Sequence, residues 1–190
     1  MAKTYVLNKK DQTLLLKLAR EAIDTVFKDA ELDVNKVGHL TQLRGCFVTL
    51  HKDNQLRGCI GFPKPIMPLY EQIIAASKAA AFEDPRFPPL NKNELKHVAI
   101  EISILTRPEL IKVKDSSEYL KSIEIGKDGL IIQGVSSGLL LPQVATEYSF
   151  DAKQFLECVS EKAGVNKDAW KDLSNKIYKF RAEIFSEDTE

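Results

Sequence analysis

Apolar residues recur along the chain with two different periods, and the period predicts the type of element. Over 9–29, 66–82 and 151–164 they fall at i, i+3 and i+4, which is typical of amphipathic helices. Asn8 or Asp11 could cap the first of these segments, because a short polar side chain can accept a hydrogen bond from a free N–H of the first turn. All three segments are therefore predicted to be helical.

The remaining apolar runs alternate with a period of two, which is typical of half-buried strands. Two hairpins are predicted, one formed by strands 43–51 and 55–62 around the turn KDN and one over 123–134. Single strands are predicted over 97–106 and 177–185, and a short strand leads into a short helix within 138–145. Alternation places one set of residues of the final strand on a common face, namely Tyr178, Phe180, Ala182 and Ile184.

The order of these elements indicates the fold class. Hairpins mixed with helices, without strict alternation of strand and helix, indicate an α+β fold with a largely antiparallel sheet and packed helices. The 190 residues suit one compact domain or two small subdomains, and no linker or low-complexity segment divides them. We therefore expect a single domain over residues 1–190.

Composition narrows the classes of partner. The 27 Lys and Arg residues balance the 27 Asp and Glu residues, and a net charge of zero argues against a large nucleic-acid interface. The N-terminus lacks an apolar signal region, and no apolar stretch approaches the length of a membrane span. The chain is therefore expected to be cytoplasmic, with no nucleic-acid and no membrane partner.

The pentapeptide QLRGC occurs twice, at 42–46 and at 55–59. In the first copy, strand parity places Cys46 in an apolar row with Val48 and Leu50, so Cys46 is expected to be a small buried side chain. Whether the cysteines of the two copies face each other depends on the register of the hairpin. A permanent disulfide is not expected in the cytoplasm.

The second copy has a different pattern. Parity places Arg57, Cys59 and Gly61 on one face, opposite the apolar pair Leu56 and Ile60. A guanidinium beside a thiol lowers the pKa of that thiol and favours the nucleophilic thiolate. Glycines within a strand mark a bulge, or the close approach of another backbone or a ligand. The candidate site residues of this strand are Arg57, Gly58, Cys59 and Gly61.

Several blocks of the sequence resemble the AMMECR-type domain family, which takes its name from the AMME-syndrome candidate region gene. LRGCIG at 56–61 resembles the family signature. The other blocks, in the order of the family, are FVTL at 47–50, AFEDPRFPPL at 81–90, EISILT at 101–106, GLLLPQVATE at 138–147, and FLECVSEKAG followed by Trp170. One departure is Phe150, where many relatives have Trp.

The resemblance implies an α+β fold with a larger and a smaller subdomain, interleaved in one domain. It implies no established activity. In some microbes similar domains occur fused with, or encoded beside, Memo-like and radical-SAM proteins, so the resemblance implies a shared modification pathway with such partners.

Polar residues elsewhere in these blocks are further candidates. Prolines in DPRFPP would hold Asp84 and Arg86 rigidly, either as site residues or as a turn cap with its paired arginine. Glu101 lies on the non-core face of its strand, where it is either solvated or, if that strand neighbours 55–61, paired with Arg57.

The segment PQVATE adds two residues that face the same way at i, i+4, Gln143 and Glu147. Glu147 is either a general base or a surface acid. The three histidines, His39, His51 and His97, match no metal-ligand spacing, so no metal site is expected. No cofactor is expected either.

Two functions are compatible with these residues. In the first, the chain is a binding module or pathway component that recognises an anionic small molecule or protein partner through LRGCIG and DPRF, with Arg57 and Arg86 contacting carboxylates or phosphates. In the second, it is an enzyme with Cys59 as nucleophile, Arg57 as its activator, and Glu101 or Glu147 as acid or base. The first is favoured, because no triad, dyad or metal set is evident.

Overall fold

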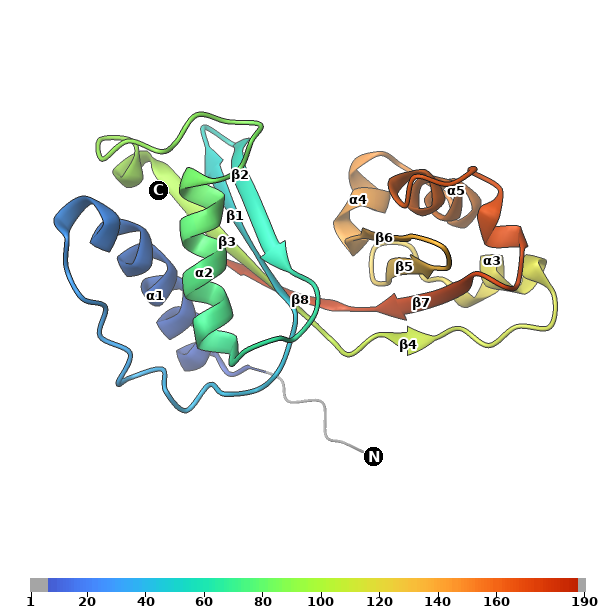
Figure 1. Ribbon diagram of the computed structural model, residues 1–190, viewed down its shortest axis with the longest axis horizontal. Helices are drawn as coiled ribbons and strands as arrows, with labels where there is room; N and C mark the ends of the chain where they lie inside the picture. The colour runs from blue at the N-terminus through green and yellow to red at the C-terminus, as the bar shows by residue number, and fades with distance from the viewer. Residues whose placement is uncertain (1–6, 188–190) are drawn as a thin grey trace. The chain divides into compact units, whose positions relative to one another are not determined.

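The computed structural model describes residues 7–187 of the chain, which forms two compact units (Figure 1). The first unit comprises the residues up to Leu105 together with those from Glu183 onward, and the second is Thr106–Ala182. Each unit combines an antiparallel sheet with helices, so the predicted α+β class is confirmed. In the described part of the chain, no helix is both long enough and apolar enough to span a membrane.

The first unit is built on a sheet with the strand order β2-β1-β3-β8. Its strands are β1 (Cys46–Lys52), β2 (Gln55–Phe62), β3 (Val98–Leu105) and β8 (Ala182–Ser186). Helices α1 (Lys9–Lys28) and α2 (Leu69–Phe82) pack against the strands, and a 3-10 turn, η1 (Leu95–His97), leads into β3. The strand β2 therefore lies at an edge of the sheet.

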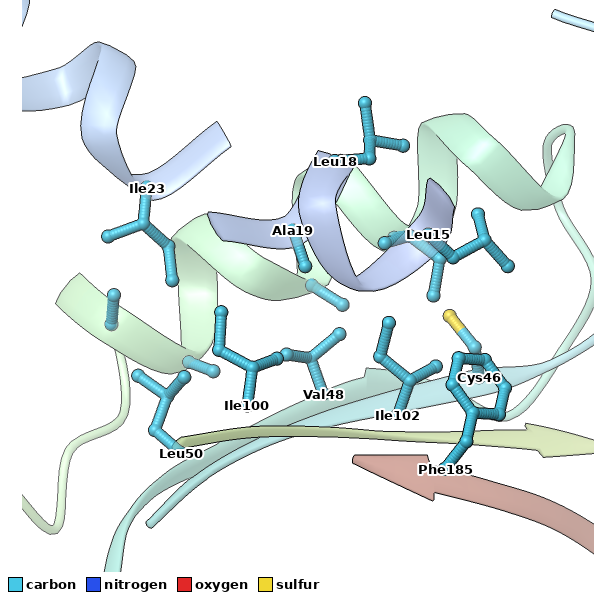
Figure 2. Close-up of a cluster of buried hydrophobic side chains, with 14 of the residues drawn as sticks. Leu15, Leu18, Ala19, Ile23, Cys46, Val48, Leu50, Ile100, Ile102 and Phe185 are labelled. Atoms are coloured by element: carbon cyan, nitrogen blue, oxygen red, sulfur yellow. The ribbon is translucent and has the colours of Figure 1, made fainter. Parts of the chain in front are cut away.

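The core of the first unit lies between the two helices and one face of this sheet. Figure 2 shows these side chains, with the sulfur of Cys46 directed toward the helices. Cys46, Val48 and Leu50 are fully buried, as predicted from strand parity. The alternating apolar residues of β3 are buried on the same face, again as predicted; they are Val98, Ile100, Ile102 and Ile104.

Local signals set the ends of the elements of the first unit. Asn8 caps α1, because its side-chain oxygen accepts a hydrogen bond from the N–H of Asp11 at 2.9 Å. Asp53 and Asn54 have φ of 51° and 59°, which gives the tight two-residue turn that joins β1 to β2. Two prolines, Pro65 and Pro68, mark possible starts of the second helix in the sequence, and the structure has the later one: α2 begins at Leu69, with Pro68 as its N-cap.

Two arginine–glutamate pairs join β8 and the residue that follows it to the rest of the first unit. Arg20 donates to Glu187 and also to the carbonyls of Leu95 and Val98, each at 2.7 Å. Arg44 lies 3.5 Å from Glu183. These pairs join α1, the start of β1 and β3 to the end of the chain.

The second unit has its own sheet, in the order β4-β7-β5-β6. Its strands are β4 (Glu109–Leu110), β5 (Gly129–Gln133), β6 (Ser137–Leu140) and β7 (Lys176–Phe180). Its helical segments are η2 (Ser116–Glu118), α3 (Tyr119–Ser122), α4 (Pro142–Glu147), α5 (Ala152–Lys162) and η3 (Ala169–Lys171).

Helix α5 begins where the sequence predicts and covers the sheet of the second unit. Asp151 and Gln154 form a capping box at its start. Gly164 follows its end with a φ of +73°, a conformation that glycine adopts without strain. The buried side chains of this unit come from the helix and the strands; they include Leu130, Ile132, Phe155, Leu156, Val159 and Ile177.

The predicted hairpin over 123–134 is wrong. The strand β5 pairs with β6 and β7, while the segment before it forms a closed turn. The N–H groups of Lys127 and Asp128 donate to the carbonyl of Glu124, and the buried Asp128 carboxylate accepts from the N–H of Glu124 at 3.0 Å. These bonds use the polar groups that a strand ladder would need.

The predicted single strand over 177–185 is also wrong. The chain leaves the second sheet after Phe180 and enters the first at Ala182, with Arg181 between. Thr106 and Arg181 bond to each other at this crossing, with the N–H of Thr106 donating to the carbonyl of Arg181 at 2.7 Å. Because the two strands belong to different sheets, the predicted common face does not exist: Phe180 is buried, whereas Ile184 is 43% exposed.

Candidate functional site

The two copies of QLRGC have different environments. The first copy ends at Cys46, which lies in the core. The second lies in β2, where the pairing with β1 slips by one residue, with Leu50 opposite Gly58 and His51 opposite Leu56. Arg57 is therefore the extra residue of a β-bulge.

The bulge changes the predicted faces of β2. Parity assigns Leu56 and Ile60 to one apolar face, but the extra residue between them moves Leu56 to the other side. Ile60 packs against the core, whereas Leu56 is 41% exposed. The prediction for Leu56 is therefore wrong.

The register also answers whether the two cysteines face each other. Cys59 lies opposite Thr49, and Cys46 lies opposite Phe62. Cys46 points into the core and Cys59 lies on the other face of the sheet, away from α1 and α2, which we call the outer face. The two thiols cannot form a disulfide across the hairpin.

Both glycines of LRGCIG are explained by close packing within the first unit. A Cβ at Gly58 would lie 2.2 Å from the carbonyl oxygen of Ala80 in α2. A Cβ at Gly61 would lie 2.3 Å from the carbonyl oxygen of Cys46 and 2.4 Å from the ring of Phe47. Gly58 therefore lets a helix backbone approach β2, and Gly61 makes room for an aromatic ring.

The loop after α2 covers the free edge of β2. The N–H of Cys59 donates to Asp84 Oδ2 at 2.8 Å, and Arg86 Nη2 donates to the carbonyl of Cys59 at 3.2 Å. Arg86 also donates to both carboxylate oxygens of Asp84, at 2.9 and 2.6 Å. Asp84 and Arg86 thus satisfy the edge groups that another strand would otherwise bond.

The electrostatics of this pair follow from its hydrogen bonds, which outweigh the opposite effect of burial on the Asp84 carboxyl. The Asp84 side chain is 2% exposed, and its hydrogen bonds from Arg86 hold the pKa of the carboxyl well below its usual range. The Arg86 side chain is 54% exposed. An anchored guanidinium therefore reaches the surface.

Arg57 pairs with a residue that the sequence analysis missed. Its Nε and Nη2 donate to Glu94 at 3.2 and 3.1 Å, and Lys52 lies 3.2 Å from the same carboxylate. These bonds, led by those of Arg57, lower the pKa of Glu94 from 4.5 to about 2. The remaining nitrogen of Arg57, Nη1, is buried without a hydrogen-bond partner in the described part of the chain.

The sequence does contain a signal for Glu94. Asn91 and Glu94 bond reciprocally, each side chain accepting from the other residue's N–H, as in a capping box. The spacing N-x-x-E before η1 predicts this arrangement. Phe87 completes the group, because its ring centroid lies 6.0 Å from Cζ of Arg57 and 5.5 Å from Cζ of Arg86.

Arg57, the predicted activator of Cys59, is not among the groups that shift the pKa of this thiol. Burial raises the pKa of the Cys59 thiol, and the hydrogen bond from Thr49 Oγ1 to Sγ at 3.3 Å and the charge of Arg86 offset this only in part. Arg57 is directed to Glu94 instead. Burial therefore favours the protonated thiol over the thiolate.

Glu101 lies in the same row as Cys59 but does not pair with Arg57. The strand β3 neighbours β1, so Thr49 separates Glu101 from Cys59. The backbone of Glu101 pairs with Thr49 in the sheet, but no hydrogen bond or ion pair joins its side chain to any residue between 7 and 187. The hydroxyl of Ser103, two residues further along the same face, is buried and equally without a partner in that range.

The remaining candidates belong to the second unit. Gln143 and Glu147 lie on α4, where Glu147 is exposed and the Gln143 side-chain oxygen is buried without a described partner. The candidate residues of the sequence analysis are thus divided between the two units. Within residues 7–187, no three acidic, histidine or cysteine side chains form a group that could hold a metal ion.

Comparison with known proteins identifies the family to which the chain belongs. The family model AMMECR1 matches residues 16–185. Protein MJ0810 of Methanocaldococcus jannaschii is 45% identical over 96% of this chain and 92% of its own length. Protein NEQ441 of Nanoarchaeum equitans is 46% identical over 92% of this chain and 99% of its own. The crystal structure of uncharacterized protein PH0010 from Pyrococcus horikoshii has a TM-score of 0.88 at 42% identity, covering 96% of this chain and 94% of that one.

Proposed function

The chain belongs to the AMMECR1 family, and from that premise we propose that it is a recognition module that binds an anionic group of a small molecule or protein partner at the covered edge of β2. One observation carries the proposal. Arg86 is fixed by a buried carboxylate, yet more than half of its side chain is exposed. A guanidinium held in one place loses little conformational freedom when it binds a carboxylate or phosphate.

The charges around this edge favour an anion. Within the group of side chains that bond one another here, Lys52, Arg57 and Arg86 carry positive charge and Asp84 and Glu94 carry negative charge, which leaves this group one positive charge in excess. Arg86 Nη1 makes no hydrogen bond with any residue in the described range. It is a free donor on a side chain that is 54% exposed and lies beside the ring of Phe87.

The alternative function, an enzyme with Cys59 as nucleophile, has less support. A cysteine nucleophile reacts as the thiolate, and burial raises the pKa of Cys59. The pathway partners implied by the family resemblance, Memo-like and radical-SAM proteins, are candidates for the partner that such a module binds.

The test of anion binding is a titration of the intact chain with hexanoate and with inorganic phosphate, followed by backbone NMR. We expect shifts at Cys59 and Arg86 that saturate. The double variant Asp84→Asn, Arg86→Met retains an acceptor for the N–H of Cys59 and should weaken binding by about tenfold or more, the loss typical of a charge-assisted hydrogen bond. Arg107→Met, at an exposed position of the second unit, is the matched control.

Three further measurements show whether weaker binding comes from the loss of the Arg86 guanidinium. Thermal unfolding of the double variant shows whether it is folded, and Arg86→Lys, which retains the charge but loses the two-pronged geometry, should bind more weakly than the wild type. Cys59→Ser should bind as the wild type does. Equal binding by the wild type and the folded double variant would refute the proposal.

The enzyme alternative has a separate measurement, the pH profile of iodoacetamide labelling of each cysteine in the native protein. We expect Cys59 to react with a pH midpoint above that of an ordinary thiol, and the buried Cys46, whose pKa burial raises to about 12, to react more slowly still. A midpoint for Cys59 well below the ordinary value would favour the enzyme over the module.

A further inference from the structure

The outer face of the first sheet carries a short row of polar side chains beside the β2 edge. The pairing registers place Cys59, Thr49 and Glu101 opposite one another on three adjacent strands, and Ser103 follows Glu101 on the same face. The only hydrogen bond recorded among these four side chains, in the described part of the chain, runs from Thr49 Oγ1 to Cys59 Sγ at 3.3 Å. The other groups of the row retain their bonding capacity.

Glu101 is unlike the other half-buried carboxylates of the first unit. Asp84, Glu94, Glu183 and Glu187 each bond to an arginine. The remaining carboxylates of this kind lie beside a histidine or a lysine; they are Asp11, Glu21 and Asp24. Glu101, which is partly buried, has no cationic partner among residues 7–187. A carboxylate removed from water without a partner is costly, so its environment favours a cation that comes from outside the chain.

Ser103 provides a second and independent observation. Its hydroxyl is 1% exposed and has no hydrogen-bond partner in the described range. Buried polar groups in folded proteins are almost always bonded, and those that are not call for an explanation. A ligand that bonds both Glu101 and Ser103 would provide one.

The available atoms specify the ligand group. A carboxylate only accepts hydrogen bonds, a serine hydroxyl can accept, and Thr49 Oγ1, whose proton is donated to Cys59, has only its lone pairs left. This set of three acceptors matches the three N–H donors of a primary ammonium group. A neutral or anionic group would leave the charge of Glu101 unbalanced.

The geometry points to a primary-ammonium subsite formed by Glu101, Ser103 and Thr49. This inference deepens the proposed function and rests on it for the ligand class. Neighbouring strands lie about 4.8 Å apart, so Cys59, whose backbone Arg86 holds, and Glu101 are separated by about 10 Å. The ligand class is therefore a small zwitterion with a primary amine at one end and a carboxylate or phosphate, bound by Arg86, at the other.

The test uses three simple probes on the intact chain: hexylammonium, hexanoate and the ω-amino acid aminooctanoate. We expect hexylammonium to shift the backbone NMR signals of Thr49, Glu101 and Ser103, and aminooctanoate to bind more tightly than either single-ended probe. Glu101→Gln should weaken hexylammonium binding by about tenfold or more, because it removes the charge while keeping the shape. Glu83→Gln, at an exposed position of the same unit, is the matched control.

A second variant tests the same subsite if Glu101→Gln does not fold. Ser103→Ala removes a buried hydroxyl without a partner, so it should leave the fold intact and still weaken hexylammonium binding. Absence of hexylammonium binding to the wild type, or equal binding by the wild type and Glu101→Gln, would overturn the inference.

The probes separate this inference from the proposed function. If hexanoate binds through Arg86 and hexylammonium does not bind, the ammonium subsite is refuted and the anion-binding function stands. If hexylammonium binds through Glu101 and hexanoate does not bind, the subsite stands and the anion-binding function is refuted. If neither probe binds, both are refuted.

Discussion

Gly58 is the residue of the signature strand whose role the structure explains most directly. The backbone of α2 approaches so closely that a methyl group at this position would overlap the carbonyl of Ala80. The same glycine follows the bulge residue Arg57, which pairs with Glu94. Packing of the helix and placement of the guanidinium therefore depend on adjacent residues.

We expect Gly58→Ala to lower the free energy of unfolding by about 2 kcal/mol or more, because a backbone carbonyl cannot move aside as a side chain can. The measurement is urea denaturation followed by circular dichroism. Gly38→Ala is the control, since a Cβ there meets its nearest neighbour at an ordinary 3.6 Å. Equal stability of the two variants would contradict the packing role of Gly58.

At the residue scale, the sequence predicts faces well where the strand is regular and fails where it is not. Cys46, Val48 and Leu50 are buried as parity predicts. Leu56 is not, because the bulge at Arg57 reverses the alternation, and a bulge depends on contacts with another strand. The partner of Arg57 was missed because Glu94 is far from it in the sequence.

At the scale of elements, the loop over 83–94 covers the edge of β2 and is joined to it by hydrogen bonds and ion pairs. Asp84 and Arg86 bond the backbone of Cys59, and Glu94 bonds Lys52 and Arg57. Both carboxyls have lowered pKa values, in each case chiefly through hydrogen bonds from an arginine. The stability that this loop contributes should therefore depend on pH.

The sign of this dependence follows from the direction of the shift. The pKa of Glu94 falls from 4.5 to about 2 on folding, so its contribution is complete above 4.5 and is lost as the pH falls toward 2. We expect Glu94→Gln to be less stable than the wild type at pH 6, and the difference to shrink below pH 4.5. Urea denaturation across this range is the measurement, with Glu83→Gln as the control. A difference that does not change with pH would contradict the assignment.

Elements with a clear periodicity, β3 among them, were predicted, and the predictions that failed are those in which distant contacts decide the pairing of a segment. The helices and the β1–β2 hairpin follow from periodicity, caps and turn residues close in the sequence. The segment 123–128 alternates like a strand but folds into a turn closed by Asp128. The run 177–185 is continuous in its pattern, but it supplies strands to two different sheets.

At the scale of the whole molecule, the second unit has the form of an insertion into the first. The chain leaves the first unit after Leu105 and returns at Glu183, and the bonded residues Thr106 and Arg181 bring the two ends of the insertion together. The second unit has its own sheet and its own buried cluster. The first unit, in contrast, needs both flanking parts of the sequence, because β8 provides Glu183 and Phe185 and is followed directly by Glu187.

We therefore expect the excised segment 106–182 to fold on its own, because a contiguous chain with its own core and adjacent ends meets the requirements of a domain. Circular dichroism and NMR of the fragment should show cooperative thermal unfolding and dispersed signals. Phe155→Ala, which opens a cavity in its core, should abolish this by removing about 3 kcal/mol or more from a small fragment.

The complementary truncation makes the converse prediction. Removal of the residues from 183 onward deprives Arg20 and Arg44 of their carboxylates and takes β8 from the sheet. We expect the first unit of this truncated chain to lose its dispersed NMR signals, while those of residues 106–182 persist. An unfolded fragment would show that the second unit depends on the first, and a truncated chain whose first unit stays folded would show that this unit does not require β8 and its carboxylates.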